Sequence, residues 1–388
     1  MPEEFAVIHQ VADFFAHGEM AEGDAERQVK PVSVRQAAWE KEVAPAGPEA
    51  VTQVAAVCMK GVGEGKHSNQ DNFFILQSKQ ASWALYGVFD GHGEFGEAMS
   101  ARLVQSLPAA FCELAQEGLP VIQAEAYLRA AFLTAEEDLK AHFGDHRGGS
   151  TGSVLLRTQD AVFMAWVGDS AVMVLEQVGE DEAFYKTHYG GDRERYAQFR
   201  KVARSFAHRP GDERELRRIQ EHGATVSRGY VRLRRKTGPN MSRCFGDFAF
   251  KPAISAEPEV VKVEITPGRA WTAVLASDGV WDAAYGCKDI GDFAQAWNQW
   301  WKDADEAAKQ TATRDPGVLH TMRTEFSHTL SVENVERYCN LPGPLGELVG
   351  RMVREAGSRR NPANCGGADN DRFYCDDIAA VVVRHRPE

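Results

Sequence analysis

The sequence predicts an α+β layered domain, in which strands and helices are grouped rather than alternating along the chain. After residue 50, short apolar runs rich in Val, Phe, Trp and Tyr have the length of β-strands. Two stretches with apolar residues at helical spacing lie together among these runs. Helices in a pair between groups of strands are typical of α+β layers and not of repeated β-α-β units.

Seven apolar runs are predicted to form strands, and several of them are apolar throughout, which is typical of strands buried on both faces. They are Gln53–Met59, Asn72–Leu76, Trp83–Phe89, Ser153–Leu156, Ala161–Val167, Trp271–Ala276 and Ile378–Val383. One helix is expected near residues 96–118, where Leu103 and Leu107 lie on one face. The same pattern predicts a second helix around Leu128–Leu139.

Residues 1–50 are predicted to form an N-terminal extension of a domain that spans residues 51–388. A short amphipathic helix is expected there, because apolar residues recur at roughly helical spacing: Phe5, Ile8, Val11, Phe14 and Phe15. A Pro- and Gly-containing stretch at residues 44–48 is typical of a linker and separates this helix from the domain.

The chain of 388 residues is 43% hydrophobic and 26% charged, a composition typical of a globular protein with a sizeable core. No run of about 18 apolar residues is present, so no membrane span is expected. The first residues lack the pattern of a secretory signal, and Pro2 stands where N-myristoylation needs glycine. Seven scattered cysteines include no Cys-x-x-Cys pair, so we expect no disulfide framework or zinc site and a cytoplasmic or nuclear location.

The net charge of −12 argues against a general nucleic-acid binder, but this charge is unevenly distributed. Residues 186–243 contain 16 Lys and Arg against 6 Asp and Glu, so the rest of the chain carries about −22. A basic region in an acidic protein can attract an anionic substrate or partner. The alternative is a solvated surface whose charges are neutralised by salt bridges.

Acidic residues stand at the ends of five predicted strands: Asp71, Asp90, Asp169, Asp278 and the pair Asp376-Asp377. Any one of them could simply cap a turn, because aspartate is a common turn residue. Five such ends are harder to explain in that way, since clustered carboxylates repel one another unless a cation lies between them. Oxygen ligands favour Mg²⁺ or Mn²⁺. The pattern therefore predicts a two-metal hydrolase in which an activated water attacks a phosphoryl group.

The order of these motifs resembles the metal-dependent protein serine/threonine phosphatases of type 2C, also called the PPM family. The resemblance spans residues 51 to 385. The motifs that carry it are Ser68-Asn69-Gln70-Asp71-Asn72-Phe73, Tyr86-Gly87-Val88-Phe89-Asp90-Gly91-His92-Gly93, Gly149-Ser150-Thr151, Val167-Gly168-Asp169-Ser170, Ser242-Arg243-Cys244-Phe245-Gly246-Asp247, Ala276-Ser277-Asp278-Gly279-Val280-Trp281-Asp282 and Asp376-Asp377-Ile378. It implies a four-layer sandwich, in which two packed antiparallel β-sheets are flanked by antiparallel α-helices and metal ions bind at one end between the sheets.

The resemblance also implies a set of metal ligands. Asp90 would bridge two ions, and the carbonyl of Gly91 would bind one of them. Asp278 and Asp376 would hold the first ion. Gln70 stands where many members have a metal-binding glutamate, so the second ion would depend on an amide or on waters.

Three further roles follow from the resemblance. Asp71 would orient the attacking water. Asp169, together with Asp278, would form a third and weaker metal site. His92 would be the general acid that protonates the leaving seryl or threonyl oxygen. A lone histidine is more often structural, but this one directly follows Asp-Gly at the predicted metal site.

Two positions depart from the family's pattern. Lys66 stands where the family often has a phosphate-binding arginine, and lysine would supply charge to the phosphate without the planar fork. Ala171 follows Val-Gly-Asp-Ser, where the family usually has arginine. Neither change removes a predicted metal ligand, so activity is still expected.

Two segments look longer than is usual in the family: Tyr189–Arg204, inside the basic stretch, and the helical stretch at about 295–343. Residues 186–243 are expected to form a basic flap region beside the active site, either steering anionic phosphopeptides or simply facing solvent. Residues 295–343 are expected to be a helical insertion. This insertion could serve in regulation or docking, or be tolerated without a role.

The function that these residues imply is hydrolysis of phosphoserine and phosphothreonine on proteins, with Mg²⁺ or Mn²⁺ as cofactor and without a phosphoenzyme. Phosphorylated proteins are then the expected partners of a monomer that binds neither nucleic acid nor membrane. The alternative is a binding or regulatory module that keeps the phosphatase fold and has weak or no catalysis. The complete set Asp90, Asp278 and Asp376 argues against that alternative.

Overall fold

The computed structural model describes most of the predicted domain and two short parts of the preceding residues. The described residues are 5–10, 41–43, 50–61, 69–78, 83–115, 119–178, 186–187, 195–196, 199–283, 297–302, 304–314, 322, 326, 331–340, 344–357 and 376–387.

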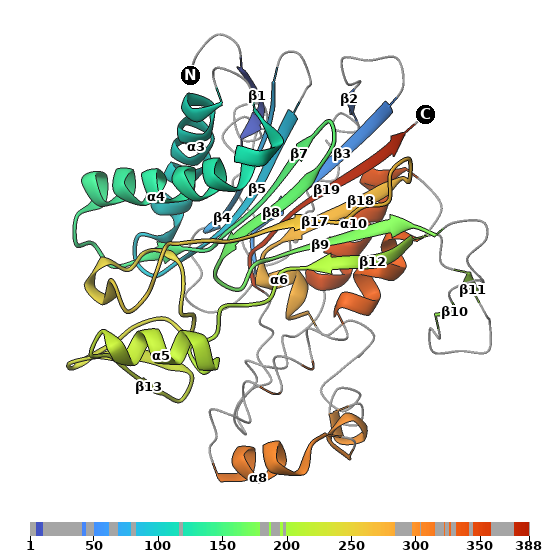
Figure 1. The fold of residues 1–388 in the computed structure, drawn as a ribbon. Helices are drawn as coiled ribbons and strands as arrows, with labels where there is room; N and C mark the ends of the chain where they lie inside the picture. Colours follow the sequence, from blue (N-terminus) through green and yellow to red (C-terminus); the bar gives the residue numbers. More distant parts are fainter. Residues whose placement is uncertain are drawn as a thin grey trace, which may run out of the picture.

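Two antiparallel sheets form the centre of the molecule (Figure 1). The first has the order β1 (Phe5–Gln10), β4 (Asp71–Ser78), β5 (Trp83–His92), β7 (Gly152–Thr158), β8 (Val162–Val167) and β17 (Glu259–Val263), with β6 (Gly149–Ser150) pairing β5 and β16 (Phe245–Gly246) pairing β6. The second has the order β12 (Phe199–Arg204), β9 (Ala171–Gln177), β18 (Trp271–Ala276), β19 (Ile378–Pro387), β3 (Ala50–Met59) and β2 (Lys41–Val43). All seven predicted strands are present, whereas β9, β12 and β17 were not predicted.

The alternation of side chains along each strand explains how the layers stack. On β5, Leu85 and Phe89 face the helices, while Tyr86 and Val88 face the second sheet. On the second sheet, Leu275 packs into the same space between the sheets. Because both faces of these strands are covered, the apolar runs are continuous rather than alternating with polar residues.

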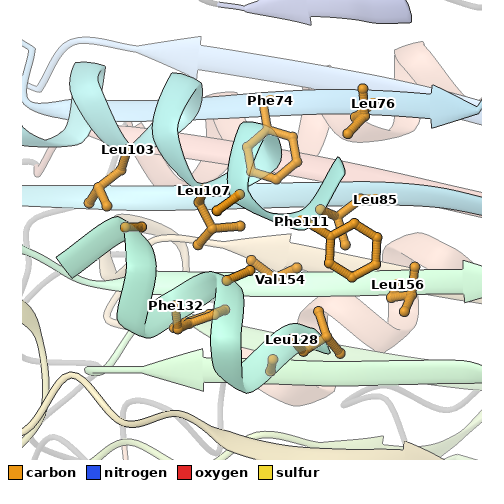
Figure 2. Close-up of a cluster of buried hydrophobic side chains, with 14 of the residues drawn as sticks. Phe74, Leu76, Leu85, Leu103, Leu107, Phe111, Leu128, Phe132, Val154 and Leu156 are labelled. Atoms are coloured by element: carbon orange, nitrogen blue, oxygen red, sulfur yellow. The ribbon is translucent and has the colours of Figure 1, made fainter. Parts of the chain in front are cut away.

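Helices cover the outer face of each sheet. The helices α3 (Gly96–Leu114) and α4 (Ala124–Phe143) pack on the first sheet through leucine and phenylalanine side chains, which Figure 2 shows meeting Phe74, Leu85 and Val154. The helix α10 (Leu345–Gly357) packs on the second sheet. The α+β four-layer sandwich implied by the resemblance is therefore confirmed.

The expected N-terminal helix is wrong, because Phe5–Gln10 forms a strand. This strand, β1, pairs with β4 in antiparallel register, from Phe5 opposite Ser78 to Gln10 opposite Phe74. Backbone groups on an exposed sheet edge are a ready partner for a nearby extended segment. Pairing with that edge outweighs the helical spacing of the apolar residues, because an isolated helix of so few residues is marginal in water. Residues 11–15 of the expected helix lie outside the described residues.

A smaller unit follows β12 and lies beside the sandwich, below α4 in the view of Figure 1. It comprises α5 (Glu213–Glu221) and a three-stranded sheet of β13 (Thr225–Ser227), β14 (Tyr230–Leu233) and β15 (Lys236–Thr237). Its own small core contains Ile219 and Val231. This unit occupies much of the predicted basic flap region.

The remaining described elements are short or peripheral. They are η2 (Val121–Gln123), η3 (Phe248–Phe250), β10 (Lys186–Thr187), β11 (Arg195–Tyr196), α6 (Asp278–Trp281), α8 (Glu306–Arg314) and the helical residues 331–339. Within residues 295–343, the described part is mostly helical. No helix in the described ranges is both long and apolar enough to cross a membrane.

Candidate metal centre and active site

The predicted acidic residues come from both sheets and meet at one end of the sandwich. Asp71 begins β4 and lies directly opposite Asp90 of β5 in the antiparallel pair. Asp278 begins α6 immediately after β18, and Asp376 lies just before β19. Because β18 and β19 pair with Ala276 opposite Ala380, these last two acids leave the second sheet at the same edge.

The carboxylates are close enough to oppose one another's ionisation. Burial raises the pKa of Asp90 well above its usual range, and the charges of four neighbours raise it further: Asp278, Asp71, Asp376 and Asp169. The pKa of Asp278 is raised in the same way, by burial and then by Asp376, Asp282, Asp169 and Asp71. Every acidic strand end predicted from the sequence therefore belongs to one electrostatic cluster.

Two loops hold Asp90 in place through its backbone. The Asp90 N–H donates to Oγ1 of Thr151 at 3.0 Å, and the Thr151 N–H donates to the Asp90 carbonyl at 2.9 Å. The hydroxyls of Thr151 and Ser170 are 2.7 Å apart, which ties the loop of Asp169 to the same point. Gly168 allows this close packing, because it has φ +97° and a Cβ there would lie 2.6 Å from the Thr151 methyl group.

Gln70 lies beside the cluster, and the nitrogen of its side-chain amide is already hydrogen-bonded. Its Nε2 donates to the Gly93 carbonyl at 2.9 Å, which leaves Oε1 as the atom able to act as a ligand. Its backbone N–H donates to Oδ2 of Asp377 at 3.0 Å, while Oδ1 of Asp377 accepts from the Gly61 N–H at 2.6 Å. Asp377 thus joins the start of β4 to the start of β19, and its neighbour Asp376 is left to face the cluster.

Gly91 occupies a position with no room for a side chain. A Cβ at Gly91 would lie 2.3 Å from the Gly96 carbonyl oxygen and 2.6 Å from that of Gln70. The Gly91 N–H donates to the Gln70 carbonyl at 3.1 Å. The glycine therefore lets β5, the start of α3 and the loop before β4 approach one another at the site.

His92 has a carboxylate partner that the sequence analysis did not identify. Its Nε2 donates to Oδ2 of Asp247 at 2.7 Å. Burial opposes ionisation of Asp247, but the interaction with His92, the hydrogen bond from Cys244 and the charge of Lys251 together outweigh burial and lower the pKa of Asp247. Gly246 and Asp247 both have positive φ, +72° and +47°, so the backbone is held in an unusual conformation that aims the carboxylate at the ring.

Cys244 completes a compact group with His92 and Asp247, whose ligand-type atoms all lie within 4.8 Å of one another. The Cys244 thiol donates to Asp247 at 3.5 Å, and burial raises the pKa of this thiol, so it stays protonated. The short hydrogen bond between His92 and Asp247 leaves no space for an ion between them. We therefore assign this group to hydrogen bonding rather than to metal binding.

Arg209 is a second functional neighbour that the sequence analysis missed. Its Nη1 lies 2.9 Å from Oδ2 of Asp169, and the side chains of both residues are largely buried. Burial opposes the charge of Arg209, but the charges of Asp169, Asp282 and Asp278 outweigh it and raise the pKa of Arg209. Asp169 is thus committed to an ion pair, so a third metal ion at this residue would compete with Arg209.

The structure brings together all but one of the predicted site residues. Asp71, Asp90, Asp169, Asp278 and Asp376 form the cluster, and Gly91, His92 and Gln70 border it. Lys66 lies outside the described residues. Asp247 and Asp282 joined the site from motifs that had been noted without a role for these residues, and Arg209 joined it from the basic flap region. The partners of Arg209 and Asp247 are 40 and 155 residues away and leave no local signal.

The residues present fit divalent metal ions. The cluster offers only oxygen donors, which suits Mg²⁺ or Mn²⁺. Burial and the neighbouring carboxylates raise the pKa of Asp90 and of Asp278, and a bound cation would relieve this repulsion. Among the described residues, the only group of metal-ligand types gathered within 4.8 Å is the one around His92.

Comparison with known proteins identifies related chains. A family model described as Protein phosphatase 2C matches residues 56–315, about two thirds of the chain. Probable protein phosphatase 1N of Mus musculus is 36% identical over 232 residues, which are 56% of this chain and 49% of that protein. Protein phosphatase fem-2 of Caenorhabditis elegans is 28% identical over 227 residues, 56% of this chain and 45% of that protein. The chain thus matches about half the length of these curated relatives.

Solved structures share the fold at low sequence identity. A serine-threonine phosphatase 2C from Toxoplasma gondii has a TM-score of 0.52 at 17% identity, covering 87% of this chain and 96% of that one. A C. elegans sex determining protein has a TM-score of 0.51 at 21% identity, covering 85% and 64%. These structures support the sandwich fold alone, whereas the family model matches the sequence itself. By that match, the chain belongs to the protein phosphatase 2C family.

Proposed function

We propose that the protein hydrolyses phosphoserine and phosphothreonine on proteins, using water activated at a binuclear Mg²⁺ or Mn²⁺ centre and forming no phosphoenzyme. The observation that carries the proposal is the cluster of Asp71, Asp90, Asp278 and Asp376, drawn from both sheets, in which burial and the neighbouring carboxylates raise the pKa of Asp90 and of Asp278. Such a cluster is costly unless cations bind to it. The matched family and the phosphatases among its relatives support the reaction class.

In this proposal Asp90, Asp278 and Asp376 hold the ions, with the Gly91 carbonyl and Oε1 of Gln70 as further oxygen donors. Bound ions would supply an activated water and neutralise charge on the phosphoryl group. Asp71 accepts a hydrogen bond from the attacking water and orients it. Lys66 binds phosphate oxygens.

His92 protonates the leaving oxygen of serine or threonine, which is a poor leaving group as an alkoxide. Asp247 holds the imidazole through the hydrogen bond at 2.7 Å. Arg209 holds the Asp169 carboxylate in place through their ion pair at 2.9 Å. The proposed protein acts as a monomer on phosphorylated proteins.

The proposal is tested by assaying phosphothreonine and phosphotyrosine peptides with Mn²⁺, with Mg²⁺ and with chelator. We expect turnover of phosphothreonine that needs metal, and a loss of at least about 10²-fold in Asp90→Ala, the scale seen when metal coordination is disturbed. Asp160→Ala, at an exposed acid on the turn between β7 and β8, is the control and should keep full activity. Metal-dependent activity that survives in Asp90→Ala would overturn the two-metal assignment.

The alternative, a regulatory module with weak or no catalysis, is favoured by one observation. Gln70 replaces the carboxylate expected at the second metal, and its Nε2 is already bound to the Gly93 carbonyl. Metal binding without turnover, in Gln70→Glu as well as in the natural sequence, would support this alternative. Turnover that rises in Gln70→Glu would instead show a catalytic site with a weakened second ion.

A further inference from the structure

The cations of the flap fall into two groups with different surroundings. On α5 and at the entry to β16, arginines are neutralised: Arg217 pairs with Glu213 at 2.9 Å, and Arg243 pairs with the buried Glu215 at 2.6 Å. On the three-stranded sheet from Thr225 to Thr237, which we call the flap sheet, five cations are exposed: Arg228, Arg232, Arg234, Arg235 and Lys236. None of these five forms an ion pair with another described residue.

The sequence explains why the flap sheet keeps its positive charge. No Asp or Glu occurs between Glu221 and Asp247. The inner face of the flap sheet packs Val226, Val231 and Leu233 into the small core of the flap. The register places Arg232 between Thr225 and Thr237 on the opposite, outer face, where Tyr230 is 42% exposed. The outer face therefore combines cations, hydroxyls and an aromatic ring.

Two of the arginines stand at turn positions that disfavour them. Arg228 and Gly229, between β13 and β14, have φ of +54° and +80°, the pattern of a type I′ turn that usually contains Asn-Gly. Arg234, between β14 and β15, has φ +57°. A left-handed conformation costs a residue with a Cβ roughly 1 kcal/mol or more. Stability alone would select glycine or asparagine here, so the arginine side chains have a use outside the fold.

Both ends of the flap are tied to the proposed active site. The chain enters the flap just after Arg209, which lies 2.9 Å from Asp169. It leaves the flap through β16, which pairs with β6, and β6 pairs with β5 at Gly91 and His92. Near the second turn, the charge of Lys236 contributes, after Lys140, to lowering the pKa of Asp145, four residues before β6. Both ends of the flap are therefore anchored at the site, and Lys236 of the flap sheet lies near the segment that leads into β6.

We propose that the flap sheet is a docking surface for an acidic segment, rich in Asp and Glu, that adjoins the phosphorylated residue of the substrate protein. This proposal rests on the proposed function and adds the substrate class. The planar guanidinium of arginine can donate two hydrogen bonds to one carboxylate. Exposed cations in an otherwise acidic protein attract anionic partners.

The size of the surface favours several carboxylates over a single second phosphate. The four residues of β14 separate the two arginine-bearing turns by about 13 Å, the length of four extended residues of a bound peptide. One phosphate cannot reach cations at both ends of this strand. A long polyanion such as RNA would meet the acidic remainder of the chain, whereas a short acidic segment would not.

The test compares two phosphothreonine peptides, one followed by four Asp and Glu residues and one in which these are Asn and Gln. Binding is measured by fluorescence anisotropy with chelator present, so that it does not depend on turnover, and kcat/KM is measured with Mn²⁺. Exposed ion pairs each contribute a factor of roughly 1.5 to 5. We expect the wild type to prefer the acidic peptide about tenfold at low salt and less at high salt.

The triple variant Arg232→Gln/Arg234→Gln/Arg235→Gln should lose most of this preference in both measurements. Arg217→Gln, which removes a flap cation already paired on α5, is the matched control and should keep it. Arg234→Gly should weaken binding of the acidic peptide while the melting temperature stays equal or rises, because glycine relieves the left-handed conformation. Weaker binding together with an equal or higher melting temperature would show that Arg234 serves in docking and not in stabilising the fold.

Several outcomes would overturn the docking surface. They are an unchanged preference in the triple variant, an equal loss in Arg217→Gln, or tighter binding of a single-stranded RNA than of the acidic peptide. A peptide carrying a second phosphate that binds better than the acidic one would also overturn it. If the wild type binds the acidic peptide selectively but hydrolyses neither peptide with Mn²⁺, the proposed function fails and the docking surface stands.

Discussion

Asp90 and His92 lie two positions apart on β5 and experience opposite electrostatic surroundings. Asp90 is buried among carboxylates that raise its pKa, so it is poised to bind cations. His92 donates to a single carboxylate, Asp247, whose backbone is held at positive φ. In the proposed function, one strand thus supplies both a metal ligand and a proton donor, and Gly91 stands between them where the backbone leaves no room for a side chain.

Replacing His92 tests the proton donor. His92→Gln should lower kcat on phosphothreonine peptides by about 10²-fold or more, because general acid catalysis typically contributes 10²–10⁴. Nitrophenyl phosphate should lose far less, since its phenolate leaves without a proton. Asp247→Asn should show the same split in milder form if Asp247 acts by holding the ring. Equal losses on both substrates would mean that His92 holds the structure or a ligand instead.

At the scale of single elements, the site depends on how closely β5, α3 and the loop before β4 approach. Gly91→Ala would place a methyl group 2.3 Å from the Gly96 carbonyl oxygen, and both nearby contacts are backbone atoms that cannot rotate away. We expect a loss of roughly 1–3 kcal/mol in the free energy of unfolding, the usual cost of overpacking. Thermal and urea unfolding would measure it. Gly211→Ala, where no atom lies within 4 Å, should leave stability within error.

The helix α5 is held by a buried carboxylate. Glu215 accepts hydrogen bonds from Nη2 of Arg243 at 2.6 Å and from the Ser242 hydroxyl at 2.7 Å. Burial opposes the charge of Glu215, but these partners and Arg218 outweigh it and lower the pKa of Glu215 to about 2. A carboxyl whose folded pKa lies below its unfolded value adds stability above pH 4.5, and this contribution is lost as the pH falls towards 2.

The pH dependence of the unfolding free energy tests this contribution of Glu215. The shift from 4.5 to about 2 corresponds to about 3 kcal/mol near neutral pH. Glu215→Gln should therefore be strongly destabilised in urea at pH 7, and the difference from the wild type should shrink by about 1 kcal/mol at pH 3.5. Glu213→Gln, at an exposed position on the same helix, should show almost no difference at either pH. If the difference in unfolding free energy between Glu215→Gln and the wild type did not change with pH, Glu215 would stabilise the protein through packing and not through its charge.

At the scale of the whole molecule, the proposed ligands are divided between the two sheets, with Asp90 on one and Asp278 and Asp376 on the other. Metal binding is therefore coupled to the packing of the sheets against each other. A ligand that binds only the folded state at 100 times its Kd adds about 2.7 kcal/mol per site. For a chain of this size, we expect Mn²⁺ to raise the melting temperature by a few degrees.

Asp90→Asn should remove most of this stabilisation by Mn²⁺. Removing the buried charge relieves repulsion, so the metal-free variant should melt higher than the metal-free wild type and gain little from Mn²⁺. Scanning calorimetry of both proteins with Mn²⁺ and with chelator measures the effect. An equal response of both proteins to Mn²⁺ would show that the ions bind elsewhere.

Local patterns in the sequence predicted the parts of the molecule that depend on near neighbours. Continuous apolar runs predicted strands such as β18. Acidic residues at the ends of these strands predicted the cluster around Asp90, because the ends of neighbouring strands lie close together in a sheet. The strand β9 was missed because the apolar run of β8 resumes after only Gly168-Asp169-Ser170. The N-terminal helix was wrong because an unpaired edge of β4 decided the structure of Phe5–Gln10.

Pairs that join distant residues could not be predicted in this way. Arg209 and Asp169 are 40 residues apart, and His92 and Asp247 are 155 apart. The motifs of His92, Asp247 and Asp169 and the basic flap region that contains Arg209 are visible in the sequence, but nothing in it places them against each other. The tertiary fold, and not any spacing along the chain, brings these charges into contact.

The place of β19 in the second sheet has a consequence for how the protein is made. This strand lies between β18 and β3 and pairs with β3 along its whole length, from Ile378 opposite Met59 to Pro387 opposite Ala50. A ribosome must therefore synthesise more than 300 residues after β3 before that pairing can form. A chain interrupted before Asp376 would lack a central strand and a proposed metal ligand together, and would leave the facing edges of β3 and β18 open to aggregation. Incomplete chains should consequently be cleared as misfolded protein, without passing through a partly active phosphatase.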